Sequence, residues 1–162
     1  MSRTAVIAGV GPGLGESLAR TFVAEGCDVG LLARSGDYLT GLASDLSGDD
    51  VTAVGAPTDI SDAEQVEQAF TFVRDELGPV DILVNHASSG AWQGLTDISI
   101  EAFEDAMLVG PYGGFLCSRQ AVSDMLETGA GTIIFTGATS AIRGRGGAVG
   151  FSAAKFGVRG LA

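Results

Sequence analysis

The chain has 162 residues, 46% of them hydrophobic, and a formal net charge of −11 at pH 7. This length suits one domain with a single core and excludes two domains of ordinary size. The negative charge argues against binding to nucleic acid or to anionic lipid, and it is typical of acidic proteins from a high-salt, halophilic cytoplasm.

Neither the N-terminal residues nor the cysteines point to export, a membrane or a metal. The opening MSRTAVIAGV lacks a basic region followed by a long apolar stretch, and no run of 18 apolar residues occurs. Cys27 and Cys117 have no histidine or second cysteine near them, so we expect buried free thiols in place of a disulfide or a metal site. The sequence therefore predicts a cytoplasmic protein without membrane contact and without a bound metal.

Short apolar runs alternate with segments of helical periodicity along the chain. The apolar runs predict five strands, over residues 4–9, 28–33, 51–56, 80–85 and 131–137. The periodic segments predict helices over residues 14–26, 38–46 and 61–78, from about Ile100 to Glu127, and within 150–162. Such alternation predicts an α/β fold with one parallel sheet, helices on both faces and right-handed crossovers.

Two of the predicted helices carry a local signal. Ser61 and Glu64 have the spacing of a capping box, so the third helix is expected to begin there. The fourth helix contains VGPYGG, and Pro111 within it removes a backbone donor and clashes with the preceding turn. We expect this helix to kink near its middle, either as a packing accommodation or as a remodelled floor of a substrate pocket.

The first strand-to-helix junction, AGVGPGLGESL, has the composition of a phosphate site. Gly9, Gly13 and Gly15 allow a tight turn, a close approach of the backbone to a ligand, and close packing of helix on strand. The N-terminus of the helix then offers unpaired N–H groups to a pyrophosphate. Because the turn directly follows the first strand of a βαβ unit, it predicts a dinucleotide site.

The end of the second strand bears on which dinucleotide is bound. The strand ends LLAR, with Ala33 where an NAD-preferring fold carries an acid for the ribose hydroxyls, followed by Arg34. A guanidinium suits a 2′-phosphate, so we expect NADP(H) in preference to NAD(H). The alternative is that Arg34 is a surface arginine near the start of a helix.

Four motifs, in this order, resemble those of the short-chain dehydrogenase/reductase (SDR) family. They are the glycine pattern of residues 9–15, PTDI after the third strand, ILVNHASSG after the fourth, and FSAAKFGVRGL in the last helix. The resemblance covers the whole chain and implies a single NADP(H)-binding Rossmann-type domain, doubly wound, over residues 1–162. It also implies the strand order 3-2-1-4-5 and hydride transfer between the cofactor and a small-molecule carbonyl or activated double bond.

The resemblance implies a set of cofactor contacts as well. Asp59 would accept a hydrogen bond from the adenine amino group, Ile60 would flank the adenine ring, and Lys155 would bind the nicotinamide ribose. The complete set comprises Gly9, Gly13, Leu14, Gly15, Arg34, Asp59, Ile60, Asn85, Ala87 and Lys155.

Other interpretations of three of these loop residues stay open. Asp59 is alternatively a loop acid ahead of the third helix, and Asn85 a turn residue at the end of the fourth strand. His86, the only histidine, stands where the family usually has asparagine. It either contacts the cofactor or is a structural loop residue.

The catalytic positions depart from the family pattern. The family uses a tyrosine as acid/base, a serine that orients the substrate oxygen, an asparagine that supports a water relay, and a lysine that lowers the tyrosine pKa. Here the asparagine, serine and tyrosine positions carry Gly110, Ala138 and Phe151, and only Lys155 is retained. A positioned acid/base contributes roughly 10²- to 10⁴-fold in rate, so its loss would cripple ordinary carbonyl reduction.

Hydroxyl groups near these positions are candidate substitutes. Ser152 follows Phe151, Tyr112 lies just after the asparagine position, and Thr139 and Ser140 lie just after the serine position. Successive residues of a strand point to opposite faces, which argues against Thr139. Ser140 is a substitute only if the strand has not yet ended.

Two function classes remain open. The first is an NADP(H)-dependent oxidoreductase whose proton comes from water, Lys155 or a relocated hydroxyl. The second is a catalytically silent nucleotide-binding protein, or a gene fragment, that keeps the cofactor cradle. The family normally continues past the position of Ala162, so we expect an incomplete C-terminus, without the last family strands, and a fifth strand at the sheet edge. A homo-oligomer through the fourth and fifth helices is also expected.

Overall fold

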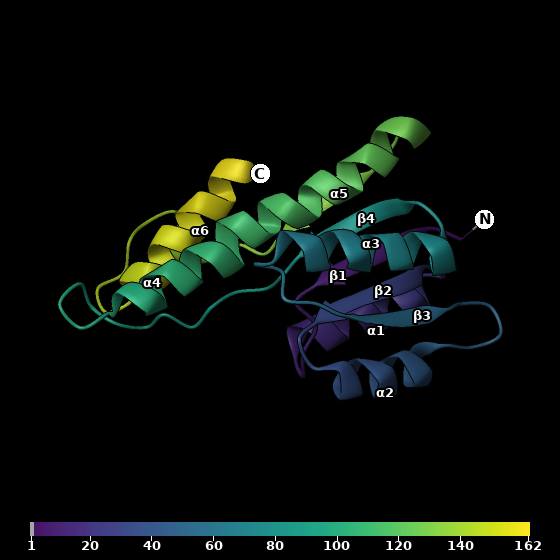
Figure 1. Ribbon diagram of the computed structural model, residues 1–162, viewed down its shortest axis with the longest axis horizontal. Coiled ribbons are helices and arrows are strands. Elements are labelled where there is room, and N and C mark those ends of the chain that lie inside the picture. Colours follow the sequence, from purple (N-terminus) through teal and green to yellow (C-terminus); the bar gives the residue numbers. More distant parts are fainter. Residues whose placement is uncertain (1) are drawn as a thin grey trace.

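Five parallel strands form one sheet, in the order β3-β2-β1-β4-β5 (Figure 1). The computed structural model describes residues 2–162. The strands are β1 (Thr4–Ala8), β2 (Asp28–Ala33), β3 (Ala53–Pro57), β4 (Val80–Asn85) and β5 (Thr132–Phe135). This arrangement confirms the predicted α/β fold and the predicted strand order, with β5 at one edge of the sheet.

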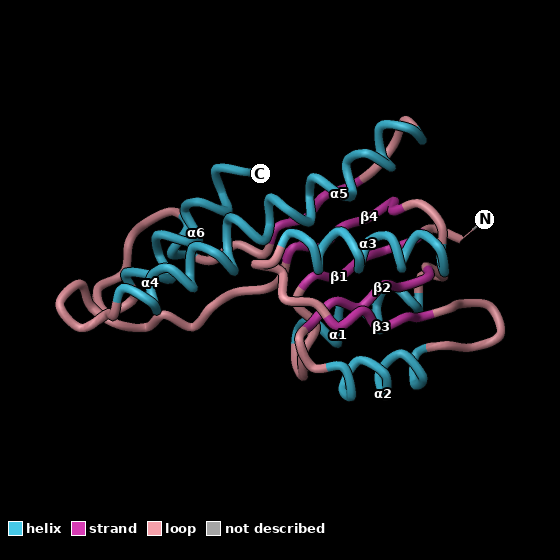
Figure 2. The backbone as a smooth tube through the Cα atoms, in the orientation of Figure 1, coloured by secondary structure: helices cyan, strands magenta, loops and turns pink. Residues whose placement is uncertain are grey.

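Helices connect the strands and cover both faces of the sheet (Figures 1 and 2). They are α1 (Leu14–Ala24), α2 (Gly36–Leu46), α3 (Ala63–Leu77), α4 (Ile100–Met107), the π-helical η1 (Leu108–Tyr112), α5 (Gly113–Thr128), the 3₁₀ turn η2 (Thr139–Ala141) and α6 (Val149–Leu161). The helices α4 and α6, with the loops that precede them, extend beyond the ends of the strands (Figure 1). The loops that precede α4 and α6 therefore lie beyond the carboxyl ends of the strands (Figure 1).

Strand β1 shows how the core divides between the two faces. All of its residues are buried, and successive side chains point to opposite sides. Val6 and Ala8 belong to a cluster that includes residues of α3 and α5, whereas Ala5 and Ile7 belong to one that includes residues of α1 and α2. Burial on both faces explains why this segment is an uninterrupted apolar run.

A partly buried ion pair joins the elements on the α3 side of the sheet. The guanidinium of Arg74 donates from Nε to the Asp124 carboxylate of α5 at 2.9 Å. The same carboxylate accepts the backbone N–H of Val80 at 3.0 Å, where β4 begins. Asp124 thus connects two helices to the start of a strand.

The start of α3 differs from the prediction. The N-cap is Asp62, whose carboxylate accepts the backbone N–H groups of Glu64 at 2.9 Å and Gln65 at 3.1 Å. The predicted capping box of Ser61 with Glu64 is therefore wrong. The Ser61 hydroxyl donates instead to the carboxylate of Asp59, at 2.6 Å.

The Pro111 segment is accommodated by a turn of π-helix between α4 and α5. The hydrogen-bond pattern of the helix changes locally here, at the residue that has no N–H to donate. Glycines allow the segment to lie close to other elements: a Cβ at Gly113 would lie 2.9 Å from Ile60, and a Cβ at Gly157 of α6 would lie 3.0 Å from Pro111. These contacts favour the packing interpretation of the segment.

Candidate cofactor site

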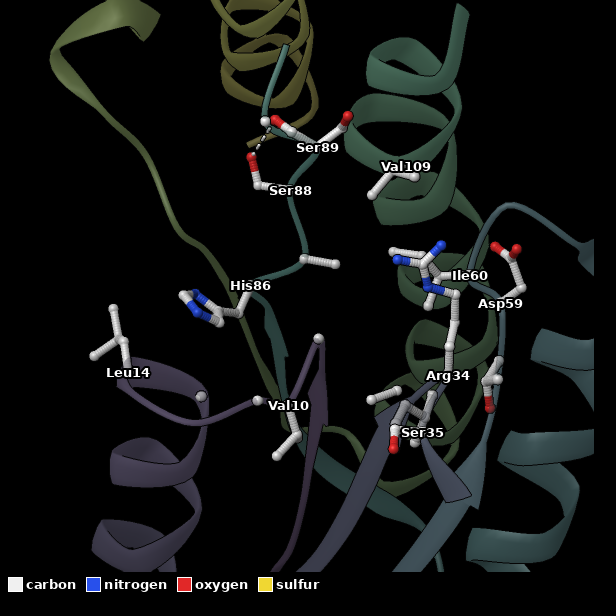
Figure 3. Close-up of a pocket in the computed structure, with 18 of the residues that line it drawn as sticks. Val10, Leu14, Arg34, Ser35, Asp59, Ile60, His86, Ser88, Ser89 and Val109 are labelled. Carbon is white, nitrogen blue, oxygen red and sulfur yellow. Dashed lines mark hydrogen bonds between the residues drawn. The ribbon is translucent and has the colours of Figure 1, made fainter. Parts of the chain in front are cut away.

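A cavity of about 660 Å³ lies at the carboxyl ends of the strands (Figure 3). Loops after β1, β2, β3 and β4 line it, and α4 and η1 complete one wall. Of the residues predicted to contact a cofactor, those that line the cavity are Gly9, Leu14, Gly15, Arg34, Asp59, Ile60 and Ala87. Such a crevice at the strand ends is where open α/β sheets bind ligands.

Glycines form the floor of this cavity because side chains do not fit there. Gly9 has a φ of 106°, and a Cβ on it would lie 2.4 Å from the backbone nitrogen of Ala87. A Cβ on Gly15 would lie 2.8 Å from the carbonyl oxygen of Gly9. The turn after β1 is thus packed against the end of β4 on one side and against α1 on the other.

Gly13 serves the turn and does not line the cavity. It is the N-cap of α1, with a φ of 127°, and no side chain caps the N–H groups of the first helical turn. Among these, the Glu16 N–H donates to the Gly11 carbonyl at 3.2 Å, so the N–H groups of Leu14 and Gly15, at the favourable end of the helix dipole, are the ones available to an anion.

The side of the cavity at β2 and β3 brings opposite charges together. Figure 3 shows Arg34, Asp59 and Ile60 near one another there. Hydrogen bonds from the hydroxyl and the backbone N–H of Ser61 lower the pKa of Asp59, and the positive charge of Arg34 lowers it further. Asp59 is consequently a stable carboxylate at neutral pH.

Ser35 stands beside Arg34 and also lines the cavity. It is the N-cap residue of α2, yet its side chain makes no capping hydrogen bond. Arginine, a free hydroxyl and a helix N-terminus thus meet at the end of β2. This combination suits a phosphate group.

Asn85 and Lys155 lie next to the main cavity and line a separate space of about 10 Å³, which has room for about one water molecule. The Lys155 ammonium donates to the Thr136 carbonyl at 2.8 Å, and burial lowers the pKa of this lysine. The Asn85 amide donates to the Ser118 hydroxyl at 3.1 Å, whereas its Oδ1 is buried without a partner among the described residues.

Two of the three positions that the resemblance predicts as substituted catalytic positions are occupied by close packing. The Phe151 ring stacks on Trp92 with centroids 4.3 Å apart, and the Lys155 ammonium lies 5.6 Å from the Phe151 centroid. A Cβ on Gly110 would lie 3.1 Å from the Cβ of Ala154 in α6. A side chain at that position would therefore require the neighbouring Ala154 to give by a few tenths of an ångström.

Ser140 was a candidate substitute only if the fifth strand continued as far as this residue, and the strand ends before it. Strand β5 ends at Phe135, and Ala138 is the extended residue just before the turn η2. Ser140 is buried within that turn. Its hydroxyl therefore does not continue the strand face on which the family's serine is expected.

Several cavity residues were not among the predicted contacts. They follow the strand ends or lie on α4 and η1: Ser35, Thr58, Ser88, Ser89, Asp105 and Val109. His86, for which a cofactor contact was one of two interpretations, also lines the cavity. Ser89 donates to the Asp105 carboxylate at 2.6 Å across the cavity wall. The position of a residue just after a strand was the available signal for most of them, but nothing in the sequence placed Asp105 or Val109 at the site.

Two further properties concern residues 2–162. No three histidine, cysteine, aspartate or glutamate side chains in this range lie close enough together to hold a metal ion. None of the helices described here has the length and apolar character needed to cross a bilayer.

Comparison with known proteins identifies the relatives of this chain. The model of the short chain dehydrogenase family matches residues 3–162. An uncharacterised oxidoreductase of Staphylococcus aureus is 30% identical over 132 residues, which are 82% of this chain and 56% of that protein. The 3-oxoacyl-[acyl-carrier-protein] reductase MabA of Mycobacterium tuberculosis is 30% identical over 162 residues, all of this chain and 61% of that protein.

Solved structures agree with these relatives. An alcohol dehydrogenase from the archaeon Thermococcus sibiricus, complexed with 5-hydroxy-NADP, superposes with a TM-score of 0.94 at 29% identity, over 99% of this chain and 68% of that one. Levodione reductase gives a TM-score of 0.91 at 29% identity, over 98% of this chain and 63% of that one. The chain spans less than two thirds of the length of the curated relatives described above.

Proposed function

Because this chain belongs to the short-chain dehydrogenase family, whose members are oxidoreductases, we propose that it binds a nicotinamide dinucleotide in the 660 Å³ cavity and prefers NADP(H) to NAD(H). The residues at the cavity fit such a ligand. The glycine floor leaves the space that a Cβ would fill, and the first turn of α1 offers N–H groups for a pyrophosphate. Asp59 and Ile60 would hold the adenine.

The preference for NADP(H) rests on one observation, the pairing of Arg34 with Ser35 at the end of β2. Both line the cavity, and Ala33 stands where an acid would hold the ribose hydroxyls of NAD(H). The archaeal alcohol dehydrogenase similar to this chain was crystallised with an NADP derivative, which supports the same choice.

The nicotinamide, when bound, supplies or accepts a hydride, and the chain's own residues decide whether a substrate proton can move with it. Phe151 has no proton to give, and Ala138 has no hydroxyl to orient an oxygen. Lys155 is held by the Thr136 carbonyl, next to the space that Asn85 also lines. We therefore propose nucleotide binding without efficient carbonyl reduction as the function of the chain.

A second candidate is reduction of an activated double bond on a small molecule. This candidate is favoured by the retained Lys155, which lines a space with room for about one water molecule. After hydride transfer to the double bond, such a water can supply the proton to the substrate carbon or oxygen that carries the negative charge. This reaction does not require a hydroxyl at the position of Phe151. Reduction of conjugated carbonyl compounds by the parent chain, and loss of that activity in Lys155→Ala, would distinguish this candidate from a catalytically silent nucleotide-binding protein.

The cofactor assignment is tested by fluorescence titration with NADPH and NADH. We expect tighter binding of NADPH in the parent chain and a loss of roughly 10- to 100-fold in NADPH affinity in Arg34→Ala, with NADH affinity unchanged, because one charge-assisted phosphate contact is removed. Arg20→Ala is the matched control, since Arg20 pairs with Glu16 on α1 and does not line the cavity. Equal affinities for the two nucleotides would overturn the preference.

We also propose that the chain self-associates through α6 and the continuous helical segment formed by α4, η1 and α5. A cytoplasmic location is part of the same proposal. Phe115 and Leu126 on α5 and Phe156 on α6 are 44%, 76% and 44% exposed. Exposed apolar side chains of this size are typical of interfaces between subunits. Sedimentation of the parent and of Leu126→Glu would test it, with a monomeric parent as the contrary outcome.

A further inference from the structure

His86 stands at the junction of the three elements that surround the phosphate end of the cavity. It follows β4 directly, and its backbone N–H donates to the Ala8 carbonyl of β1 at 2.9 Å. Its ring lies over the first turn of α1, with Cδ2 3.4 Å from where a Cβ on Gly15 would be. Figure 3 shows it on the Leu14 side of the cavity, away from Arg34.

Thr136 fixes the orientation of this ring. The Thr136 hydroxyl lies 3.1 Å from Nδ1 of His86, and the carbonyl of the same residue accepts the Lys155 ammonium at 2.8 Å. The threonine itself is held by its backbone N–H, which donates to the Asn85 carbonyl at 2.9 Å. The imidazole is therefore a half-buried, oriented group and not a freely rotating surface side chain.

The surroundings of the ring favour its neutral form in the free protein. Burial lowers the pKa of His86, and the positive charge of Lys155 on α6 lowers it further. The other groups placed against the ring, Gly15 on α1 and Thr136 after β5, are uncharged. An anion at the start of α1 would supply the missing opposite charge and favour the protonated ring.

We propose that His86 is a cofactor-positioning residue that, as an imidazolium, donates Nδ1–H to Thr136 and Nε2–H to a pyrophosphate oxygen of the bound dinucleotide. This role rests on the proposed function, because it needs a dinucleotide in the cavity. It adds one charged side-chain donor to a phosphate site otherwise built from backbone N–H groups.

Proton uptake on binding is the direct signature of this role. The chain contains one histidine, so its imidazole gives a single Cε1–H resonance that needs no assignment by mutation. We expect the pH midpoint of this resonance to rise by about one unit when NAD⁺ is added, since a phosphate charge now faces the ring. NAD⁺ is used because the 2′-phosphate of NADP⁺ itself titrates near pH 6, by analogy with other phosphate monoesters.

The affinity for NAD⁺ must depend on pH in a matching way, because proton uptake by His86 and NAD⁺ binding are thermodynamically linked. A midpoint raised by about one unit corresponds to roughly tenfold tighter binding of NAD⁺ well below pH 6 than at pH 8. In His86→Gln, which keeps an amide donor but does not titrate, this pH dependence should be lost. Thr136→Val, which removes the hydroxyl that orients the ring, should reduce it.

The two proposals fail in different ways. Saturable binding of NAD⁺ with an unmoved histidine midpoint, or an unchanged pH dependence in His86→Gln, would overturn the role of His86 alone. Absence of binding by NAD⁺ and by NADPH at any pH would overturn the proposed function and this inference together. The midpoint is measured on the parent chain, so it does not depend on whether either variant folds.

Discussion

Trp92 covers one face of the Phe151 ring, with centroids 4.3 Å apart and planes inclined by 29°. The backbone reinforces this contact, because the N–H of Phe151 donates to the Ala91 carbonyl at 3.3 Å. The loop after β4 is thus attached to the start of α6 at Phe151, the position that the resemblance predicts for the family's catalytic tyrosine. This aromatic stack holds the loop against α6 and contributes no proton.

Restoring the two lost hydroxyls should create carbonyl reductase activity. In Phe151→Tyr combined with Ala138→Ser, we expect NADPH-dependent reduction of simple ketones and aldehydes to rise by roughly 10²-fold or more over the parent, because an acid/base and an orienting donor are present again. The assay follows loss of NADPH absorbance. The same pair of changes in a Lys155→Ala background is the control, and a parent already turning over about ten times per second would contradict the idea.

The floor of the cavity should tolerate a methyl group at one glycine and reject it at another. Gly9→Ala places Cβ 2.4 Å from the Ala87 nitrogen at a positive φ, whereas a Cβ on Gly11 meets nothing within 4 Å. We expect Gly9→Ala to lower the free energy of unfolding by about 3 kcal/mol or more and to abolish nucleotide binding. Gly11→Ala should leave the free energy of unfolding nearly unchanged in urea denaturation. Similar midpoints for the two variants would show that the turn can rearrange.

Acid should destabilise the parent chain more than a variant without the histidine. Burial, followed by the charge of Lys155, lowers the pKa of His86 below its ordinary value of 6.5, so the folded chain binds this proton less readily than the unfolded chain does. The free energy of unfolding therefore rises with pH up to about 6.5 and loses this contribution as the pH falls below it. Urea denaturation at pH 5 and pH 8 should show a smaller difference for His86→Gln. An equal difference in both chains would contradict the burial of the imidazole.

Added salt should stabilise the fold. With a net charge of −11, the folded chain carries a self-repulsion that counterions screen, so the melting temperature should rise between dilute buffer and molar potassium chloride. A chain in which Glu64, Glu67 and Asp75 on α3 are replaced by their amides should show a weaker salt response. A melting temperature that does not change with salt would remove the argument for a high-salt habitat.

The sequence defined the sheet well because its signals are local. The predicted ranges 28–33 and 80–85 match β2 and β4 residue for residue, since buried parallel strands are short apolar runs with clear ends. The cap of α3 was assigned to Ser61 because the capping-box pattern fitted, but Asp62 is one residue closer to the helix and accepts two N–H groups. The π-turn depends on how Pro111 and its neighbouring glycines pack against α6 and Ile60, which no local pattern encodes.

The candidate site likewise contains residues that the sequence predicted and contacts that it did not. Gly9 and Arg34 each follow a strand directly and Asp59 lies two residues after β3, so the order of the strands was enough to bring them to one cavity. The partners of Lys155 and His86 were not predictable, because both depend on Thr136, a residue with no signal of its own. Contacts that join separate elements through one polar residue need the packed structure.

The contact between Gly9 and Ala87 has a consequence for how this protein can evolve. The floor of the cavity is backbone pressed against backbone, so substitutions there damage the fold before they alter the ligand. Arg34 and Ser35, by contrast, are exposed at the rim and carry little of the core. If Arg34 and Ser35 select the dinucleotide as proposed, selection can exchange one dinucleotide for the other by changing the rim residues alone, while the floor is inherited unchanged.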